Sequence, residues 1–316
     1  MKAMRYHGYG DSGVLVHEET GRPSAGPGQV VIRVAGTAFN PVDAVIRAGV
    51  LPEVFPVTFP HTPNYDVAGV VTEVGEGVAG WSPGDAVVGF LPMNAPGAAA
   101  EYVAAPADVL AAAPRTVDLA DAAALPSVAL TARQALFEDG GLAEGAGPDG
   151  GRRVLVNGAG GAVGGYAVQL AARAGASVTA TASPRSRDRV RSYGAARIVD
   201  HTVAPVAEAL AGERFDVVLN LVTTDPGETA ALVDLVADGG TFASTTTPGP
   251  DDAGRGVRTA RVFVRTDAAR LAELVGLVDA GELTVDVAER LPLADLASVH
   301  DRAAAGRLAG RTVLVP

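Results

Sequence analysis

Residues 153–165 of this chain read Arg153-Val154-Leu155-Val156-Asn157-Gly158-Ala159-Gly160-Gly161-Ala162-Val163-Gly164-Gly165. A short β-branched run leads directly into closely spaced glycines, and an apolar segment at helical spacing follows. Gly158, Gly161 and Gly164 recur at every third residue, which lets the backbone turn sharply and pack a new helix closely against its strand. The free N–H groups in the first turn of such a helix bind anions. The stretch therefore predicts a strand, a phosphate-binding turn and a helix.

The sequence that follows the glycines supports this prediction. Apolar residues continue at helical spacing to Ala174, Gly175 is a helix stop, and a second β-type run occupies Ser177 to Ala182. Strand, glycine turn, helix and strand within about thirty residues form the βαβ unit that a dinucleotide fingerprint requires. A glycine-rich hinge in an alanine-rich protein is the alternative interpretation.

Composition limits the class of protein. At 316 residues the chain exceeds the ~250–300 residues at which one hydrophobic core stops growing, so two domains are expected. The formal charge of −11 argues against nucleic acid and against an anionic membrane surface as partners. Because the chain has no cysteine, disulfides, thiolate metal sites and cysteine nucleophiles are excluded. The N-terminus lacks the apolar region of a secretory signal, so we expect a cytoplasmic location.

Two kinds of segment follow one another along the chain. Short β-type runs such as Gln29–Val34 and Ala68–Gly75 alternate with Gly, Pro and Asp turns over the first ~120 residues, which favours a β-barrel-like fold. Beyond the glycine stretch, strand-like runs at 196–199, 215–219 and 240–244 alternate with helical segments, which predicts a parallel sheet covered on both faces.

The remaining segments are expected to be a loop, a helix and a C-terminal strand-helix-strand segment. Gly140 to Gly151 is predicted to be a loop, and a helix is predicted from Ala268 to Asp279 with Gly281 as its stop. Residues 284–316 are predicted to form a strand, a helix and a final strand.

Short motifs along the whole chain occur in the order that one family uses. They are Phe39–Asp43, Asp66–Val71, Val74–Val78, Pro83–Val87, Ala100–Val103, Ala123–Pro126, Leu130–Ala132, the glycine turn and Gly310–Leu314. In these motifs the chain resembles the medium-chain dehydrogenase/reductases, and among them the zinc-free quinone oxidoreductases related to zeta-crystallin. The resemblance implies an α/β fold class: a GroES-like β-barrel substrate domain at 1–124, completed by 270–316, and a Rossmann domain with a doubly wound parallel sheet at 125–269. It also implies an active site in the cleft between the two domains.

The chain departs from the zinc-dependent members of that family. Those members hold a catalytic metal with a Cys and a His-Glu pair, and this chain has no cysteine. His61 precedes Thr62-Pro63 without a following Glu, so we interpret it as a surface or hydrogen-bonded histidine and predict no metal site. Asn64 stands where the family usually has Gly; because Asn tolerates a positive φ, the turn is expected to survive.

The residue that follows the second strand of the βαβ unit determines whether NADH or NADPH binds. An acidic residue there accepts a hydrogen bond from the ribose 2′-OH of NADH and repels the 2′-phosphate of NADPH. This chain has Ser183 at that place, with Arg185 and Arg187 close behind, so NADP(H) is the predicted cofactor. Arg187 and Arg191 lie four residues apart and also fit the solvated face of a helix. His201 falls where the family often has a Tyr beside the adenosine phosphate, and an ordinary loop histidine is the alternative.

Further cofactor contacts are expected at the carboxyl ends of the parallel strands, where ligands of such sheets bind. Thr131 matches a family position near the nicotinamide, although a helix-interior threonine without a ligand role is the alternative. The predicted cofactor-binding residues are Thr131, Gly158, Gly160, Gly161, Ala162, Val163, Gly164, Ser183, Arg185, Arg187, His201, Asn220, Leu221, Ser244 and Thr245.

The family's reaction is hydride delivery from the nicotinamide to a quinone or an enone. Without zinc, the negative charge that develops on oxygen must be met by hydrogen-bond donors or water. Asn40 and Tyr65 can donate, and Asp43 can fix Asn40 or a water, so these three are the predicted catalytic residues. Asn40-Pro41-Val42-Asp43 is also a natural turn and helix cap, which leaves a purely structural role for Asp43 open.

The sequence thus predicts an NADPH-dependent, zinc-independent reductase of a small quinone or α,β-unsaturated carbonyl. A non-catalytic NADPH-binding protein with a structural or sensing role is the alternative from a different class, and a biosynthetic tailoring reductase is a further one. A homodimer is expected from the family, with the β-branched and aromatic run Ala260–Val264 as the pairing strand.

Overall fold

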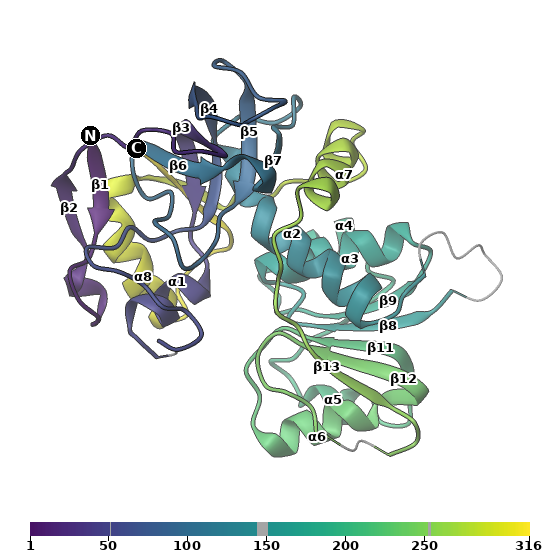
Figure 1. Cartoon of the computed structure of the whole chain (residues 1–316). Coiled ribbons are helices and arrows are strands. Elements are labelled where there is room, and N and C mark those ends of the chain that lie inside the picture. Colours follow the sequence, from purple (N-terminus) through teal and green to yellow (C-terminus); the bar gives the residue numbers. More distant parts are fainter. Residues whose placement is uncertain (51, 144–150, 252–253) are drawn as a thin grey trace. The chain divides into compact units, whose positions relative to one another are not determined.

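The computed structural model describes residues 1–50, 52–143, 151–251 and 254–316 (Figure 1). Most of the loop predicted at 140–151 therefore lies outside the described residues. The chain divides into two compact units. Unit one comprises Met1–Ser127 and Thr266–Pro316, and unit two comprises Val128–Arg265.

Unit two is a parallel sheet with helices on both faces, the doubly wound Rossmann architecture that the glycine stretch predicted. Its six strands run in the order β10-β9-β8-β11-β12-β13, and each neighbouring pair is parallel. In Figure 1, α3 lies on one side of this sheet and α6 on the other. The strands are β8 (Arg153–Asn157), β9 (Ser177–Thr181), β10 (Arg197–Val199), β11 (Phe215–Asn220), β12 (Val236–Ser244) and β13 (Arg258–Arg261). The helices are α3 (Ala162–Arg173), α4 (Arg187–Ser192), α5 (Val206–Ala209) and α6 (Pro226–Asp234).

The edge strand β13 differs from its prediction. It ends at Arg261, so the predicted run to Val264 is wrong for its last three residues. Arg261 lies opposite Ser244, the last residue of β12, so β13 ends where its partner strand ends. Beyond it, Gln134 pairs with the backbone of Arg265: the Gln134 Nε2 donates to the Arg265 carbonyl and its Oε1 accepts from the Arg265 N–H, both at 2.9 Å. Gln134 begins a π-helical turn, Gln134–Asp139, that directly follows α2 (Pro126–Arg133).

Unit one is a mainly antiparallel, GroES-like fold, as the family resemblance implied. Its main sheet has the order β14-β15-β3-β4-β5-β7, and β6 also pairs with β3. The last strand of the chain, β15, pairs antiparallel with β3, so the C-terminal segment completes the N-terminal sheet. The strands are β3 (Gln29–Ala38), β4 (Asp66–Val74), β5 (Ala86–Phe90), β6 (Tyr102–Pro106), β7 (Leu110–Ala112), β14 (Glu289–Pro292) and β15 (Thr312–Val315), with a separate hairpin of β1 (Lys2–Arg5) and β2 (Val16–Glu19).

Three α-helices of unit one lie at positions where the sequence predicted helix starts or stops. They are α1 (Pro41–Arg47), α7 (Ala268–Asp279) and α8 (Leu296–Ala304). Asp267 caps α7 by accepting from the Arg270 N–H, and Gly281 follows the helix with φ 73°, which confirms the predicted start and stop. Within the described residues, no helix has both the length and the apolar composition that crossing a membrane requires.

Candidate functional site

The glycine turn joins β8 to α3 as predicted. Gly158 has φ 96°, a conformation that favours glycine, and its carbonyl accepts from the Gly161 N–H at 3.0 Å. Gly161 is the residue before the helix, with φ −82° and ψ 171°, and its carbonyl accepts from Gly165. The N–H groups of the first turn of α3 therefore emerge at the carboxyl edge of the parallel sheet, where an anion can accept from them.

A Cβ placed on each glycine distinguishes internal packing from space for a ligand. At Gly164 the Cβ would stand 2.3 Å from the Gly158 carbonyl oxygen, and at Gly160 it would stand 2.6 Å from the Ser186 Oγ. At Gly161 the nearest protein atom is the Gly158 oxygen at 3.4 Å, which is ordinary contact. Packing against backbone atoms therefore requires glycine at 164, whereas a Cβ at 160 would displace the Ser186 hydroxyl and Gly161 leaves room beside the helix start. This is the position at which the sequence predicts the diphosphate.

Polar side chains tie the strand ends together around this turn. The Asn157 Nδ2 donates to the Asn220 Oδ1 at 2.9 Å, and the Thr181 Oγ1 donates to the Asn157 Oδ1 at 3.0 Å. Thr181 also accepts from the Gly158 N–H at 2.8 Å, which fixes the first residue of the turn. Sequence reasoning missed Asn157 and Thr181, although each is the polar last residue of an apolar strand.

Two predicted cofactor residues belong to the same polar network. Asn220 and Ser244 are fully buried, and the Asn220 Nδ2 lies within 3.4 Å of the Ser244 Oγ. Their side chains hold β11 to β12. The next residues, Leu221 and Thr245, are more accessible, and their N–H groups donate to the Asn157 carbonyl at 2.9 Å and to the Asn220 carbonyl at 3.1 Å. Thr131 lies in α2.

The residues predicted for the 2′-phosphate gather at the ends of β9 and β10. Ser183 is half-buried, and Arg185 and His201 are exposed. Arg187 forms an ion pair with Asp200, with 2.8 Å between the Arg187 Nη2 and the Asp200 Oδ2. Sequence reasoning missed this pairing because the partners lie on different segments, thirteen residues apart.

A buried charged network is the centre of unit one. The Asp66 carboxylate accepts from the Ser127 N–H at 2.7 Å, from the Ser127 Oγ at 2.6 Å and from the Asn40 Nδ2 at 2.8 Å, and it pairs with the Arg311 Nη2. The Arg311 Nη1 donates to the Phe39 carbonyl at 2.8 Å and to the Asn40 Oδ1 at 2.6 Å. Removing one member of a buried ion pair costs about 3–5 kcal/mol because the other charge stays unpaired.

This network engages both ends of the Asn40 amide, so Asn40 acts here as a positioning group. Sequence reasoning singled out Asn40 but missed Asp66 and Arg311 as its partners. The sequence did hold a signal for these partners. Each is the one charged residue in a short motif of otherwise uncharged residues, Asp66–Val71 and Gly310–Leu314.

Asp43 is the third residue of α1 and is fully buried. Its Oδ2 accepts from the Asn40 N–H at 2.7 Å, which is the helix-cap role that the sequence left open, while its Oδ1 has no protein partner. Burial raises the pKa of Asp43 to about 8, and the nearby Asp66 charge adds to this rise. Asp43 thus keeps its proton at pH 7 and can both cap the helix and supply a proton.

Tyr65 and His61 form a second buried pair. The Tyr65 hydroxyl lies 3.0 Å from the His61 Nε2, and each residue is 1% exposed. Burial raises the pKa of Tyr65 above its ordinary value and lowers the pKa of His61 to about 4, so both are neutral at pH 7. His61 is therefore hydrogen-bonded, and Asn64 has φ 65°, as the sequence predicted for both. Among the described residues, no group of three or more His, Cys, Asp or Glu is arranged to hold a metal ion.

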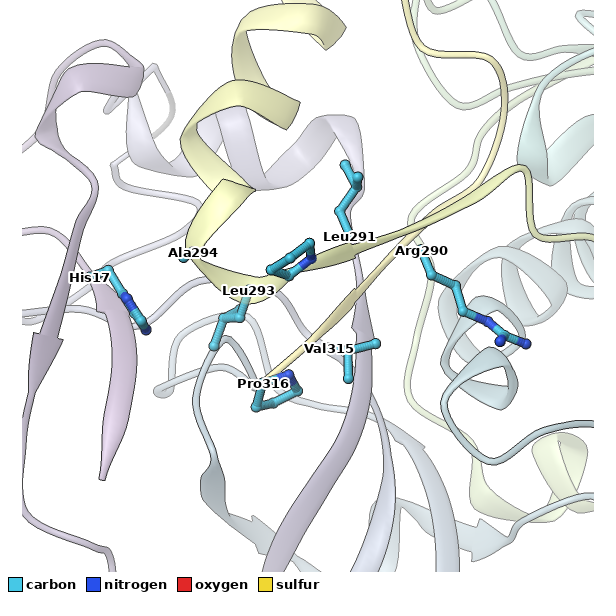
Figure 2. A pocket seen from close by; sticks show the side chains of 8 residues that line it. His17, Arg290, Leu291, Leu293, Ala294, Val315 and Pro316 are labelled. Carbon is cyan, nitrogen blue, oxygen red and sulfur yellow. The ribbon is translucent and has the colours of Figure 1, made fainter.

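A pocket of about 460 Å³ lies elsewhere in unit one (Figure 2). Apart from His17 and Arg290 its lining is apolar, and the Arg290 guanidinium is paired with Asp121. No predicted site residue borders it. The lining residues are His17, Arg290, Leu291, Pro292, Leu293, Ala294, Val315 and Pro316.

Comparisons with known proteins agree with this architecture. A model described as "Alcohol dehydrogenase GroES-like domain" matches residues 26–115, and one described as "Zinc-binding dehydrogenase" matches residues 193–314. A chloroplast envelope quinone oxidoreductase homolog of Arabidopsis thaliana is 31% identical over 100% of this chain and 98% of its own length.

An NADPH-dependent alkenal/one oxidoreductase, also of Arabidopsis thaliana, is 36% identical over 78% of this chain and 62% of its own length. The solved quinone oxidoreductase of Coxiella burnetii has a TM-score of 0.87 at 26% identity, covering 100% of this chain and 99% of its own. The chain belongs to the medium-chain dehydrogenase/reductase superfamily, in its quinone oxidoreductase branch.

The glycine turn yields a test that separates cofactor binding from folding. Gly161→Val is expected to abolish NADPH binding, because the side chain occupies the diphosphate space, while the unfolding midpoint of the nucleotide-free protein stays within a few degrees of the parent. Gly164→Ala is the matched control and should destabilise the nucleotide-free protein by about 1–3 kcal/mol through overpacking. Fluorescence titration with NADPH and thermal unfolding by circular dichroism measure the two effects. Normal NADPH binding by Gly161→Val would refute the phosphate site.

Burial of Asp43 makes unit one sensitive to pH. Burial raises the pKa of Asp43 from its ordinary 3.8 to about 8 in the folded protein, so its stabilising contribution is complete below pH 3.8 and is lost as pH rises toward 8. Asp43→Asn keeps an acceptor for the Asn40 N–H but cannot ionise. Between pH 5.5 and 7.5 the variant should gain stability relative to the parent by roughly 1.4 kcal/mol per pH unit.

The single tryptophan, Trp81, lies in unit one, so its fluorescence during urea unfolding measures this unit. The buried histidines are present in both proteins, so their contribution to the pH dependence cancels when the free energy of unfolding of the parent is subtracted from that of the variant. Parallel stability curves for parent and variant would show that Asp43 titrates with its ordinary pKa.

Proposed function

We propose that the chain is an NADPH-dependent oxidoreductase that delivers hydride to a quinone or an α,β-unsaturated carbonyl without zinc. The observation that carries this proposal is the glycine turn, which leaves space for a diphosphate at Gly161 at the carboxyl edge of a parallel sheet. The names of the quinone and alkenal/one oxidoreductases to which the chain is similar support the same reaction class.

The nucleotide is assigned to unit two. In this proposal the diphosphate accepts from the N–H groups of Ala162, Val163 and Gly164, and the adenosine phosphate lies beside Ser183 and Arg185. Bound there, reduced nicotinamide supplies the hydride. The chain's own contribution is to orient the nucleotide along the strand ends that Asn157, Thr181 and Asn220 hold together.

The proton is assigned to unit one. Reduction of an enone or a quinone by one hydride consumes one proton, and Asp43 retains a proton at pH 7. Its Oδ2 is held by the Asn40 N–H, whereas its Oδ1 has no protein partner. We assign the proton-donor role to Asp43 and the role of oxygen-stabilising donor to Tyr65, with Asn40 as the residue that positions Asp43.

Independence from zinc follows from the residues that the chain lacks. Zinc sites in proteins need three or four side-chain ligands. The chain has no cysteine, and His61 is committed to the Tyr65 hydroxyl. Neutral donors therefore take over the stabilisation of developing negative charge that a metal provides in other dehydrogenases.

The activity can be measured directly. The purified protein in buffer with EDTA should oxidise NADPH, followed at the reduced-nicotinamide band, in the presence of at least one member of a panel of quinones and enones, and should prefer NADPH to NADH. Asp43→Asn should reduce turnover by about 10²–10⁴-fold because it removes a proton donor, while Arg5→Gln, a surface change on β1, should not. Binding of NADPH without turnover of any acceptor would favour the non-catalytic alternative.

We also propose that the protein is a homodimer that pairs through β13. Within the described residues β13 is the edge strand of its sheet, and Phe263, just beyond it, is 52% exposed under the Arg261 guanidinium. Unpaired edge strands invite pairing with another chain. Light scattering should report twice 31.8 kDa at micromolar concentration, and Phe263→Asp should shift the mass toward the monomer. A parent protein of 31.8 kDa would contradict the proposal.

A further inference from the structure

The ends of β9 and β10 place a carboxylate beside the adenosine-phosphate region. The two strands are parallel neighbours, with Thr181 level with Val199, and the Ala182 N–H donates to the Val199 carbonyl at 3.0 Å. Ser183 and Asp200 therefore follow at the same edge of the sheet. An acid at this edge ordinarily favours NADH, because it repels a 2′-phosphate.

Asp200 is fixed in place and charged. Its Oδ1 accepts from the Thr202 Oγ1 at 2.6 Å and from the Thr202 N–H at 3.0 Å, and its Oδ2 accepts from the Arg187 Nη2 at 2.8 Å. The bonds from Thr202, with the Arg187 charge, hold the pKa of Asp200 below its ordinary value. Asp200 is thus an anion at every pH at which the enzyme would be assayed, with Arg187 as its counter-ion.

The other three arginines between residues 185 and 191 differ in whether a protein group occupies their guanidinium. The Arg189 Nη2 donates to the Gly160 carbonyl at 2.8 Å, and Arg191 pairs with Asp188. Arg185 is exposed, and within the described part of the chain it makes no hydrogen bond or ion pair. Arg185 is therefore the cation of this segment whose charge is available to a phosphate.

We propose, resting on the NADPH-dependent function above, that Arg187 sets the nucleotide preference indirectly by cancelling the charge of Asp200, and that Arg185 bonds the 2′-phosphate. Arg187 is then a specificity residue that acts through Asp200. Without Arg187, Asp200 becomes the acid that turns the same strand ends toward NADH.

The decisive experiment compares two probes that differ only in the 2′-phosphate, adenosine 2′,5′-bisphosphate and AMP, by isothermal titration calorimetry. Arg185→Ala should weaken the bisphosphate roughly 10–100-fold and leave AMP unchanged, because it removes a charge-assisted contact. Arg187→Ala should weaken the bisphosphate at least tenfold. Arg191→Ala, on the same helix but paired with Asp188, is the matched control and should change neither probe.

The double variant Arg187→Ala with Asp200→Asn separates the proposal from direct contact. If Arg187 acts by cancelling Asp200, removing both charges restores bisphosphate binding to within about threefold of the parent. If Arg187 itself bonds the phosphate, the double variant stays at least tenfold weak and the proposal is overturned. Thermal unfolding of each variant without nucleotide verifies the fold.

The parent protein distinguishes this inference from the function on which it rests. A parent that binds neither NADPH nor NADH overturns the proposed function and the inference together. A parent that binds NADPH selectively, with no rescue in the double variant, overturns the inference alone.

Discussion

The architecture of unit two depends on one backbone contact, the approach of α3 to the turn that precedes it. A Cβ on Gly164 would stand 2.3 Å from the Gly158 carbonyl oxygen, so only glycine lets the helix lie this close to β8. The close approach brings the first turn of α3 to the sheet edge, and it lets Thr181 reach the Gly158 N–H from β9. The absence of a side chain at Gly164 thus permits the packing of α3 and the glycine turn against β8 and β9.

Electrostatics has the corresponding role in unit one. Asp66 and Arg311 are buried, and the polar groups around them complete their hydrogen bonds. The same Asp66 charge contributes to the raised pKa of Asp43, so the network that stabilises this unit also favours the protonated form of its neighbour. Buried polar atoms are not all satisfied, however: the Arg47 Nε and Nη1 and both ring nitrogens of His300 have no protein partner. Such uncompensated groups cost stability and are typical of functional regions.

The sequence predicted what depends on local pattern. The glycine turn, α7 between Asp267 and Gly281, and the positive φ at Asn64 were all readable because propensity and spacing specify them within a few residues. Features that depend on distant partners were not. The Arg187–Asp200 pair joins two strand ends, and the Asp66–Arg311 pair joins residues 245 positions apart.

The edge strand shows the same limit. The β-branched run at 260–264 indicated a strand, but the partner strand β12 ends opposite Arg261, and Gln134, far away in the sequence, pairs with Arg265. Which predicted site residues contact a nucleotide or an acceptor is decided by the variants described with each proposal.

Arg311 follows unit two in the sequence, and this order has a consequence for biosynthesis. Residues 128–265, which form unit two, are contiguous and are complete before residues 266–316 have been made. Unit one cannot close at that stage, because β15 and the partner of Asp66 have not yet emerged from the ribosome. At ~5–20 residues per second, the N-terminal sheet waits many seconds with an unpaired acid at its centre. We therefore expect unit two to mature first on the ribosome and unit one to fold only after residues 266–316 have emerged.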